Sequence, residues 1–308
     1  MIANFFSKTK PIHAVLVGGL FLFFFVLAIL VVERPVFSWN FFFEKLGLSI
    51  AFLCLFFVVR FINRKNNLTD QNSYVLLVLA LLFATYPATM QYSNVFVAHF
   101  LLLLAFRRIY SLRTFKSIKQ KLFDAGFWIG IATVFFNWSI LFFLLIPVAT
   151  IVYKKQSIRH FIIPIVGFVT PFFLLFTYYY WIDNATLMYQ FFYFEIGFSL
   201  IAFVQPAYMI AAITISALLI IGIVVVSFRI NSQSNEFGQS WLLLLVHFVL
   251  AWVVLLLSAN KEGTEVVVIF LPATFILANL LQQIPGKVLK EVMIFGMLAL
   301  AMHVYLTA

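Results

Sequence analysis

Residues 12–39 read IHAVLVGGLFLFFFVLAILVVERPVFSW, and the character of this stretch changes once along its length. From Ile12 to Leu30 every residue except His13 is apolar or glycine, and a run of this length is close to the roughly 20 residues that cross a bilayer core. Glu33, Arg34 and Pro35 then end the run. Charges beside a proline are typical of a membrane surface. No small-residue cleavage site follows the run, so we expect a retained transmembrane helix.

The composition extends this interpretation to the whole chain. Of 308 residues, 65% are hydrophobic and 10% are charged, whereas soluble domains are about half apolar and a quarter charged. This much apolar surface needs lipid as its solvent, which predicts an all-α polytopic membrane protein. The single cysteine, Cys54, excludes an intrachain disulfide and a cysteine-based metal cluster.

The number of membrane helices follows from the apolar runs. Two runs, 74–106 and 122–153, are each predicted to form a hairpin of two short helices, with turns near Pro87 and Asn137. About eleven spans result: 12–32, 41–60, 74–87, 91–106, 123–137, 139–153, 160–181, 207–228, 241–258, 265–282 and 291–307.

The basic residues predict the orientation of these spans. With both hairpins formed, an amino terminus in the cytoplasm and a carboxyl terminus outside place 17 of the 20 basic residues on the cytoplasmic side, as the positive-inside rule requires. The same arrangement places four acidic residues inside and six outside. The net charge of +10 therefore suits insertion and anionic lipid, and no basic run is interleaved with exposed aromatics as a nucleic-acid groove would require.

Acidic residues at the predicted outer surface are the first candidates for chemistry. Glu33 follows the first span, and partial desolvation at the edge of the lipid suits a carboxylate to proton transfer, although a purely structural role stays open. The segment 33–46 is expected to lie along the outer surface, with Glu44 and Lys45 forming a weak interfacial pair.

Two further acids flank an aromatic outer segment. Asp183 ends the band TYYYWID, and Glu195 lies among large apolar residues in FFYFEIGF, where an acid must find a partner or take up a proton. Both are candidates for the acceptor side of a reaction. The neighbouring aromatics can equally form an interfacial belt.

Two outer cations can hold a phosphate of a lipid carrier. Lys261 lies in the polar loop SANKEGTE, and the guanidinium fork of Arg34 suits a diphosphate. A solvated loop is the alternative for both. Phosphate-cradling glycine loops and hydrolase motifs are missing, and no histidine pair has the spacing of metal ligands on one helix face. No metal-ligating residues and no cofactor are therefore predicted, and dependence on a divalent metal stays open. His99, His247 and His303 lie in predicted spans, where we expect hydrogen bonds between helices.

Three features together resemble the C-type membrane glycosyltransferase superfamily, which uses polyprenyl-phosphate sugars as donors. They are the acid directly after the first span, the two short hairpins, and the charged outer loop in NKEGTEVVVIFLPATFILANLL, which leads into the span with Pro272. The resemblance covers most of the chain in layout and only patches of it in residues. It implies Glu33 as the catalytic base and Lys261 as a ligand of the lipid phosphate.

The resemblance also implies a division of the chain. A single integral membrane domain, 1–308, would consist of a glycosyltransferase-C-like module over 1–181 and carboxyl-terminal helices over 182–308, with no soluble domain. The opening MIANFFSKTKPIHAVLV is similar to a group of Bacteroidota inner-membrane proteins with no assigned activity, which implies the bacterial inner membrane as the location.

Two other classes of function stay open. The first outer loop is short and lacks the second acid that is often found in the superfamily, which favours a non-enzymatic subunit or scaffold of an inner-membrane complex. A transporter would need charges inside its spans, and apart from the histidines these are almost lacking. The expected partners are the bilayer and either a polyprenyl-phosphate lipid or another membrane protein.

Overall fold

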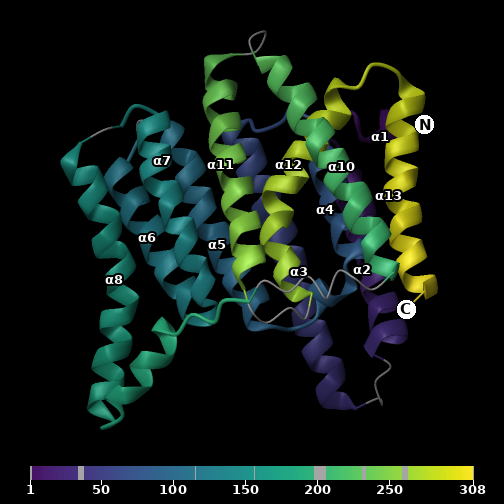
Figure 1. Ribbon diagram of the computed structural model, residues 1–308. Helices are drawn as coiled ribbons and strands as arrows, with labels where there is room; N and C mark the ends of the chain where they lie inside the picture. The colour runs from purple at the N-terminus through teal and green to yellow at the C-terminus, as the bar shows by residue number, and fades with distance from the viewer. Residues whose placement is uncertain are drawn as a thin grey trace. The chain divides into compact units, whose positions relative to one another are not determined.

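Nearly every described residue lies in a helix. The structure, a computed structural model, describes residues 2–33, 38–114, 116–155, 157–197, 206–230, 234–258 and 263–307. Within these ranges the nearest approach to a strand is one isolated bridge between Ile196 and Ser258. The predicted all-helical fold is therefore confirmed (Figure 1).

Eight helices within the described ranges are long and apolar enough to cross a membrane, which indicates a multi-pass membrane protein. They are α2 (Pro11–Ala28) continued by the π-helical turn η1 (Ile29–Glu33), α3 (Trp39–Asn66), α5 (Asn94–Tyr110) continued by η3 (Ser111–Arg113), α8 (Ile158–Trp181), α10 (Pro206–Phe228), α11 (Asn235–Leu257), η7 (Thr264–Val266) continued by α12 (Val267–Gln283), and α13 (Lys287–Thr307).

Three further helical segments are shorter or more charged. They are α4 (Tyr74–Thr85), α6 (Ile118–Phe135), and η4 (Asn137–Leu144) continued by α7 (Leu145–Val152). The 3-10 turn η2 (Pro87–Met90) separates α4 from α5, and η4 begins directly after the end of α6. Both long apolar runs are thus interrupted where Pro87 and Asn137 predict a break.

The start of α3 corrects one expectation. Residues 39–46 do not form a separate surface segment, because they are the first two turns of a 28-residue helix. The helix begins where the Ser38 side chain accepts a hydrogen bond from the Phe41 amide at 3.2 Å, as an N-cap residue does.

The chain divides into two compact units that interleave along the sequence. The first contains Met1–Tyr92, Leu200–Ser234 and Lys261–Ala308, and the second contains Ser93–Ser199 and Asn235–Asn260. Neither unit coincides with 1–181 or 182–308, and that division stays a prediction.

The first unit is built around α4 and α12. Every residue of α4 is buried, and the whole membrane-length window of α12 is buried inside the protein. The Phe83 ring packs against Phe21, Phe52 and Phe270, with ring centroids 4.9 to 5.8 Å apart, and these contacts join four helices. Because its neighbours enclose it, α4 needs no lipid-facing surface of its own.

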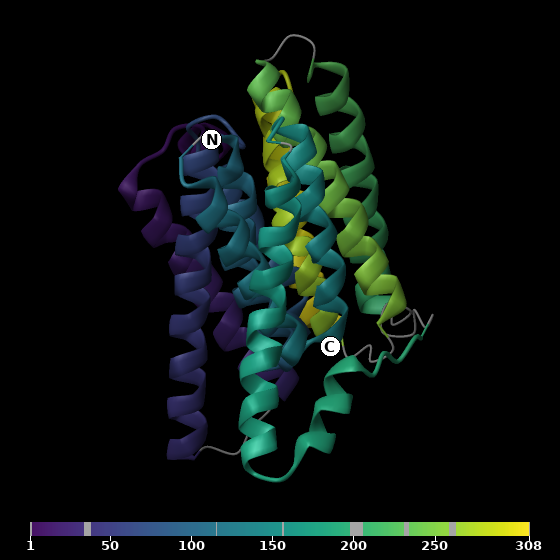
Figure 2. The same cartoon turned by 90° about the vertical axis from the view of Figure 1, so that its left-hand side faces the viewer.

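The loops of the first unit collect at two ends. At one end Asn279 Nδ2 donates to the Leu68 carbonyl and Arg229 Nη1 donates to the Gln283 carbonyl, each at 3.0 Å, which joins the loops after α3, α10 and α12. At the other end η2 contacts both α2 and η7. The long helix α3 runs between these ends (Figure 2).

The second unit contains the most extensive helix contact of the described chain, between α6 and α8. A Cβ atom added to Gly126 would collide with the carbonyl oxygen of Pro164, and one added to Gly167 would collide with that of Phe123. Small residues that let backbones touch are characteristic of helix association in membranes.

Candidate functional site

Glu33 is the last residue of a π-helical turn that ends the first span. Such turns are rare and occur frequently at functional sites, because the extra residue re-aims the side chains around it. Both carboxylate oxygens of Glu33 lie 2.7 Å from Lys45 Nζ, and the Glu33 side chain is 17% exposed. The turn therefore presents a partly accessible carboxylate that a cation holds in place.

The partner of Lys45 corrects the sequence interpretation. Lys45 projects from the second turn of α3 and pairs with Glu33, twelve residues earlier, whereas its chain neighbour Glu44 is exposed. Adjacent residues on a helix point in different directions, so a pair between residues 44 and 45 is disfavoured once both lie in α3.

A second carboxylate lies at the same end of the first unit. Glu265, in η7, is 3% exposed, and its Oε2 accepts a hydrogen bond from the Gly263 amide at 3.1 Å. η7 contacts η2, which in turn contacts α2, the helix that η1 extends. A buried acid therefore shares this end with Glu33, although the sequence suggested only a solvated loop leading into a span.

Asp183 and Glu195 both belong to the second unit and are exposed. Asp183 follows α8 with a left-handed backbone (φ 51°), and Glu195 comes after the 3-10 helix η5 (Ala185–Phe192). Eight residues of 3-10 helix extend about 16 Å, so η5 separates the two carboxylates rather than bringing them together. Glu33 belongs to the first unit.

The segment that carries Glu195 is held at both sides. Asn137 Nδ2 donates to the Tyr193 carbonyl at 2.6 Å, and the Gly197 amide donates to the Leu257 carbonyl at 3.2 Å. The turn between α6 and η4 and the end of α11 therefore lie together at one end of the second unit. Asn137, predicted only as a turn residue, ties this segment to the helices.

The two predicted phosphate ligands, Arg34 and Lys261, lie outside the described residues.

Of the three histidines in predicted spans, His247 forms the expected hydrogen bond between helices, whereas Nδ1 of the buried His99 has no hydrogen-bond partner among the described residues. In the second unit the Tyr110 hydroxyl of α5 and Nδ1 of His247 in α11 share a buried hydrogen bond of 3.1 Å. In the first unit Nδ1 of His13 lies 2.9 Å from the Ser73 hydroxyl, joining α2 to the start of α4. No group of three potential metal-ligating His, Cys, Asp or Glu side chains occurs among the described residues.

These features define a multi-pass helical membrane protein with a carboxylate-bearing π turn at the end of its first span. The chain belongs to the family of unknown function DUF6427, which matches residues 1–308. Comparison with curated proteins and with solved structures gives no match.

Proposed function

We propose that the chain crosses the inner membrane of a bacterium eleven times, with its amino terminus in the cytoplasm. Within each unit the loops separate cleanly into two ends, which supports alternation of the helices. In the second unit Lys121 Nζ donates to the Ser111 carbonyl at 2.6 Å, and Arg113 pairs with Glu236 at 3.4 Å, so these basic loops share an end. The positive-inside rule then makes the basic ends cytoplasmic.

We further propose that the protein transfers a sugar from a polyprenyl-phosphate carrier to an acceptor at the extracytoplasmic face. The observation that carries this proposal is the Glu33 carboxylate, which a π turn exposes at the end of the first span and which Lys45 orients. The position matches the acid that serves as the base in the C-type glycosyltransferases that the sequence resembles.

The reaction assigns a task to each group. The acceptor hydroxyl oxygen attacks the anomeric carbon while the bond from that carbon to the phosphate oxygen breaks, and Glu33 takes the hydroxyl proton. Polyprenyl phosphate leaves with the bonding electrons, and the anomeric configuration inverts. Arg34 and Lys261 would stabilise the charge that develops on the leaving phosphate.

The test uses purified protein in lipid nanodiscs, polyprenyl-phosphate sugars extracted from bacterial membranes, and a bacterial envelope extract that supplies the acceptor hydroxyl groups. We expect wild-type protein to release polyprenyl phosphate, and Glu33→Gln to reduce the rate by about 100-fold or more, the usual contribution of a general base. Glu44→Gln is the matched control, since Glu44 is an exposed acid of the adjoining helix. Equal rates for Glu33→Gln and wild type would overturn the role of Glu33, and no release by wild type would overturn the transferase.

A non-enzymatic subunit of a membrane complex is the second candidate. The observation that favours it is the same ion pair, because a carboxylate with both oxygens 2.7 Å from one ammonium nitrogen can serve simply to join η1 to α3. This function predicts a membrane protein that co-purifies at a fixed ratio and is lost on Lys45→Gln. It also predicts that no lipid carrier is retained.

A further inference from the structure

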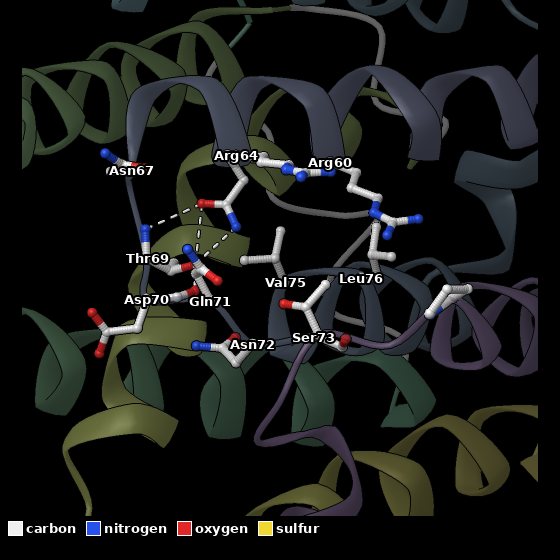
Figure 3. A pocket seen from close by; sticks show the side chains of 13 residues that line it. Arg60, Arg64, Asn67, Thr69, Asp70, Gln71, Asn72, Ser73, Val75 and Leu76 are labelled. Atoms are coloured by element: carbon white, nitrogen blue, oxygen red, sulfur yellow. Dashed lines mark hydrogen bonds between the residues drawn. The ribbon is translucent and has the colours of Figure 1, made fainter.

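The carboxyl-terminal end of α3, opposite the end that carries Lys45, forms one side of a polar pocket (Figure 3). The pocket has a volume of about 400 Å³, within the usual size range of ligand sites. The pocket lies entirely in the first unit, and four segments line it: the last turns of α3, the loop 67–73, the start of α2 and the start of α4. Arg60 and Arg64 supply its positive charge, and Asp70 is its one acidic lining residue.

The two arginines lie one helical turn apart on the same side of α3 (Figure 3). Like charges at this spacing repel each other, and neither guanidinium forms an ion pair with a described residue. The Asp70 carboxylate points away from both of them in Figure 3. The pocket therefore carries net positive charge that the described protein does not neutralise.

The loop opposite the arginines is fixed to α3 by hydrogen bonds. Asn63 Nδ2 donates to the Thr69 hydroxyl at 2.8 Å, and the Thr69 amide donates to Asn63 Oδ1 at 3.1 Å (Figure 3). Asn63 and Thr69 are both buried. The pocket is thus preformed, and these groups need no ligand to hold them.

Two helix starts also border the pocket. Val75 and Leu76, in the first turn of α4, line it, and Ser73 does not cap this helix with its side chain, because its hydroxyl lies against His13 and Lys8 instead. Pro11, the first residue of α2, lines it too, and α2 has no side-chain cap either. The first amide of α4, that of Tyr74, donates to Asn72 Oδ1 at 3.0 Å, and the remaining amides of the two helix starts carry partial positive charge that adds to that of the arginines.

We propose that this pocket binds a phosphate-bearing anion, with Arg60 and Arg64 as its ligands. A guanidinium group can donate two parallel hydrogen bonds to a pair of phosphate oxygens. An anion bound between Arg60 and Arg64 would also offset the repulsion between their positive charges. Lys45 and Arg60 are fifteen residues apart on one helix, about 22 Å at 1.5 Å per residue, so this site is separate from the Glu33 turn and independent of the proposed transferase.

The phosphate has two possible sources, and the experiment uses one arm for each. In the first arm, full-length protein in phosphatidylcholine nanodiscs is dialysed against radiolabelled pyrophosphate. In the second, native mass spectrometry counts phosphatidylglycerol retained by the protein in an excess of phosphatidylcholine. We expect the double variant Arg60→Gln/Arg64→Gln to bind either pyrophosphate or phosphatidylglycerol at least tenfold more weakly than wild type.

Lys65→Gln is the matched control, because it removes one positive charge next to Arg64 from a residue that does not line the pocket. We expect less than a threefold effect from it. Loss in the first arm identifies a soluble phosphate ligand, and loss in the second identifies a lipid headgroup.

The pocket is not such a site if wild type and the double variant bind equally in both arms, or if Lys65→Gln loses as much as the double variant. Should the glutamine variant fail to fold, Arg60→Lys/Arg64→Lys keeps the charge but not the paired geometry. Its binding should then be severalfold weaker than that of wild type, and equal binding would overturn the proposal.

Discussion

Lys45 Nζ lies 2.7 Å from both carboxylate oxygens of Glu33, so the second turn of α3 holds the end of the first span. The two side chains are 11% and 17% exposed, which places the pair between a fully solvated ion pair and a buried one. Such a pair both fixes the carboxylate and limits its access to other groups.

The strength of this pair can be measured by a double-mutant cycle. We expect Glu33→Gln and Lys45→Gln each to destabilise the protein, with a coupling energy of about 1 kcal/mol, because partial exposure lets solvent screen the attraction. Thermal unfolding in detergent measures the four proteins of the cycle. A cycle between Glu44 and Lys45 should show coupling close to zero, and a larger value there would contradict the geometry.

Because the backbones of α6 and α8 touch, we expect the stability of the protein to fall when a single methyl group is added between them. Gly126→Ala places a methyl group against the Pro164 carbonyl oxygen, so we expect a loss of about 1–3 kcal/mol, typical of overpacking. Gly47→Ala in α3 is the control, because a Cβ there meets nothing within 4 Å. We expect it to be neutral or slightly stabilising, and equal melting temperatures for the two variants would show that the helices are not this close.

The hydrogen bond between Tyr110 and His247 predicts a cost for removing one hydroxyl group. Both residues are buried, and His247 Nε2 has no hydrogen-bond partner among the described residues. Tyr110→Phe also leaves Nδ1 unpaired, and we expect a loss of about 1–3 kcal/mol on thermal unfolding. Tyr180→Phe, at a position 68% exposed, should change the stability little. If the two variants melt alike, the buried hydrogen bond does not form.

The proposed orientation predicts which loops an impermeant maleimide reaches in intact cells. In a Cys54→Ser background, Tyr92→Cys should react from outside, because Tyr92 is 63% exposed and follows η2 at the proposed outer end. Asn67 is exposed and directly follows α3 at the proposed cytoplasmic end, so Asn67→Cys should react only after the cells are opened. The reverse pattern would invert the topology.

The sequence predicts the positions of the helices well, because lipid demands continuous apolar runs and tolerates breaks only at residues such as Pro87 and Asn137. It does not predict which helices face lipid. The membrane windows of α2 and α12 are both strongly apolar, yet 28% of the first is buried inside the protein and all of the second. Lipid tails are as apolar as a protein core, so hydrophobicity does not distinguish these environments.

The candidate site was predictable only in part. The position of Glu33 follows from the end of an apolar run. Its pairing with Lys45 requires α3 to begin at Trp39, and the apolar pattern does not mark that start. The positive-inside rule counts Arg60 and Arg64 only as two of the 17 basic residues on the cytoplasmic side. Their spacing of four on one helix, without an acid to match, is a signal that could have pointed to the pocket.

Mass spectrometry of the lipids retained by gently solubilised, purified protein tests the central claim most directly. We predict that wild-type protein retains a polyprenyl phosphate or its sugar adduct, and that Arg34→Gln/Lys261→Gln loses it. Arg60→Gln/Arg64→Gln, at the other end of α3, should retain it. Bulk phospholipid alone in the wild-type preparation, with a second protein present at a fixed ratio, would contradict the transferase and favour the structural subunit.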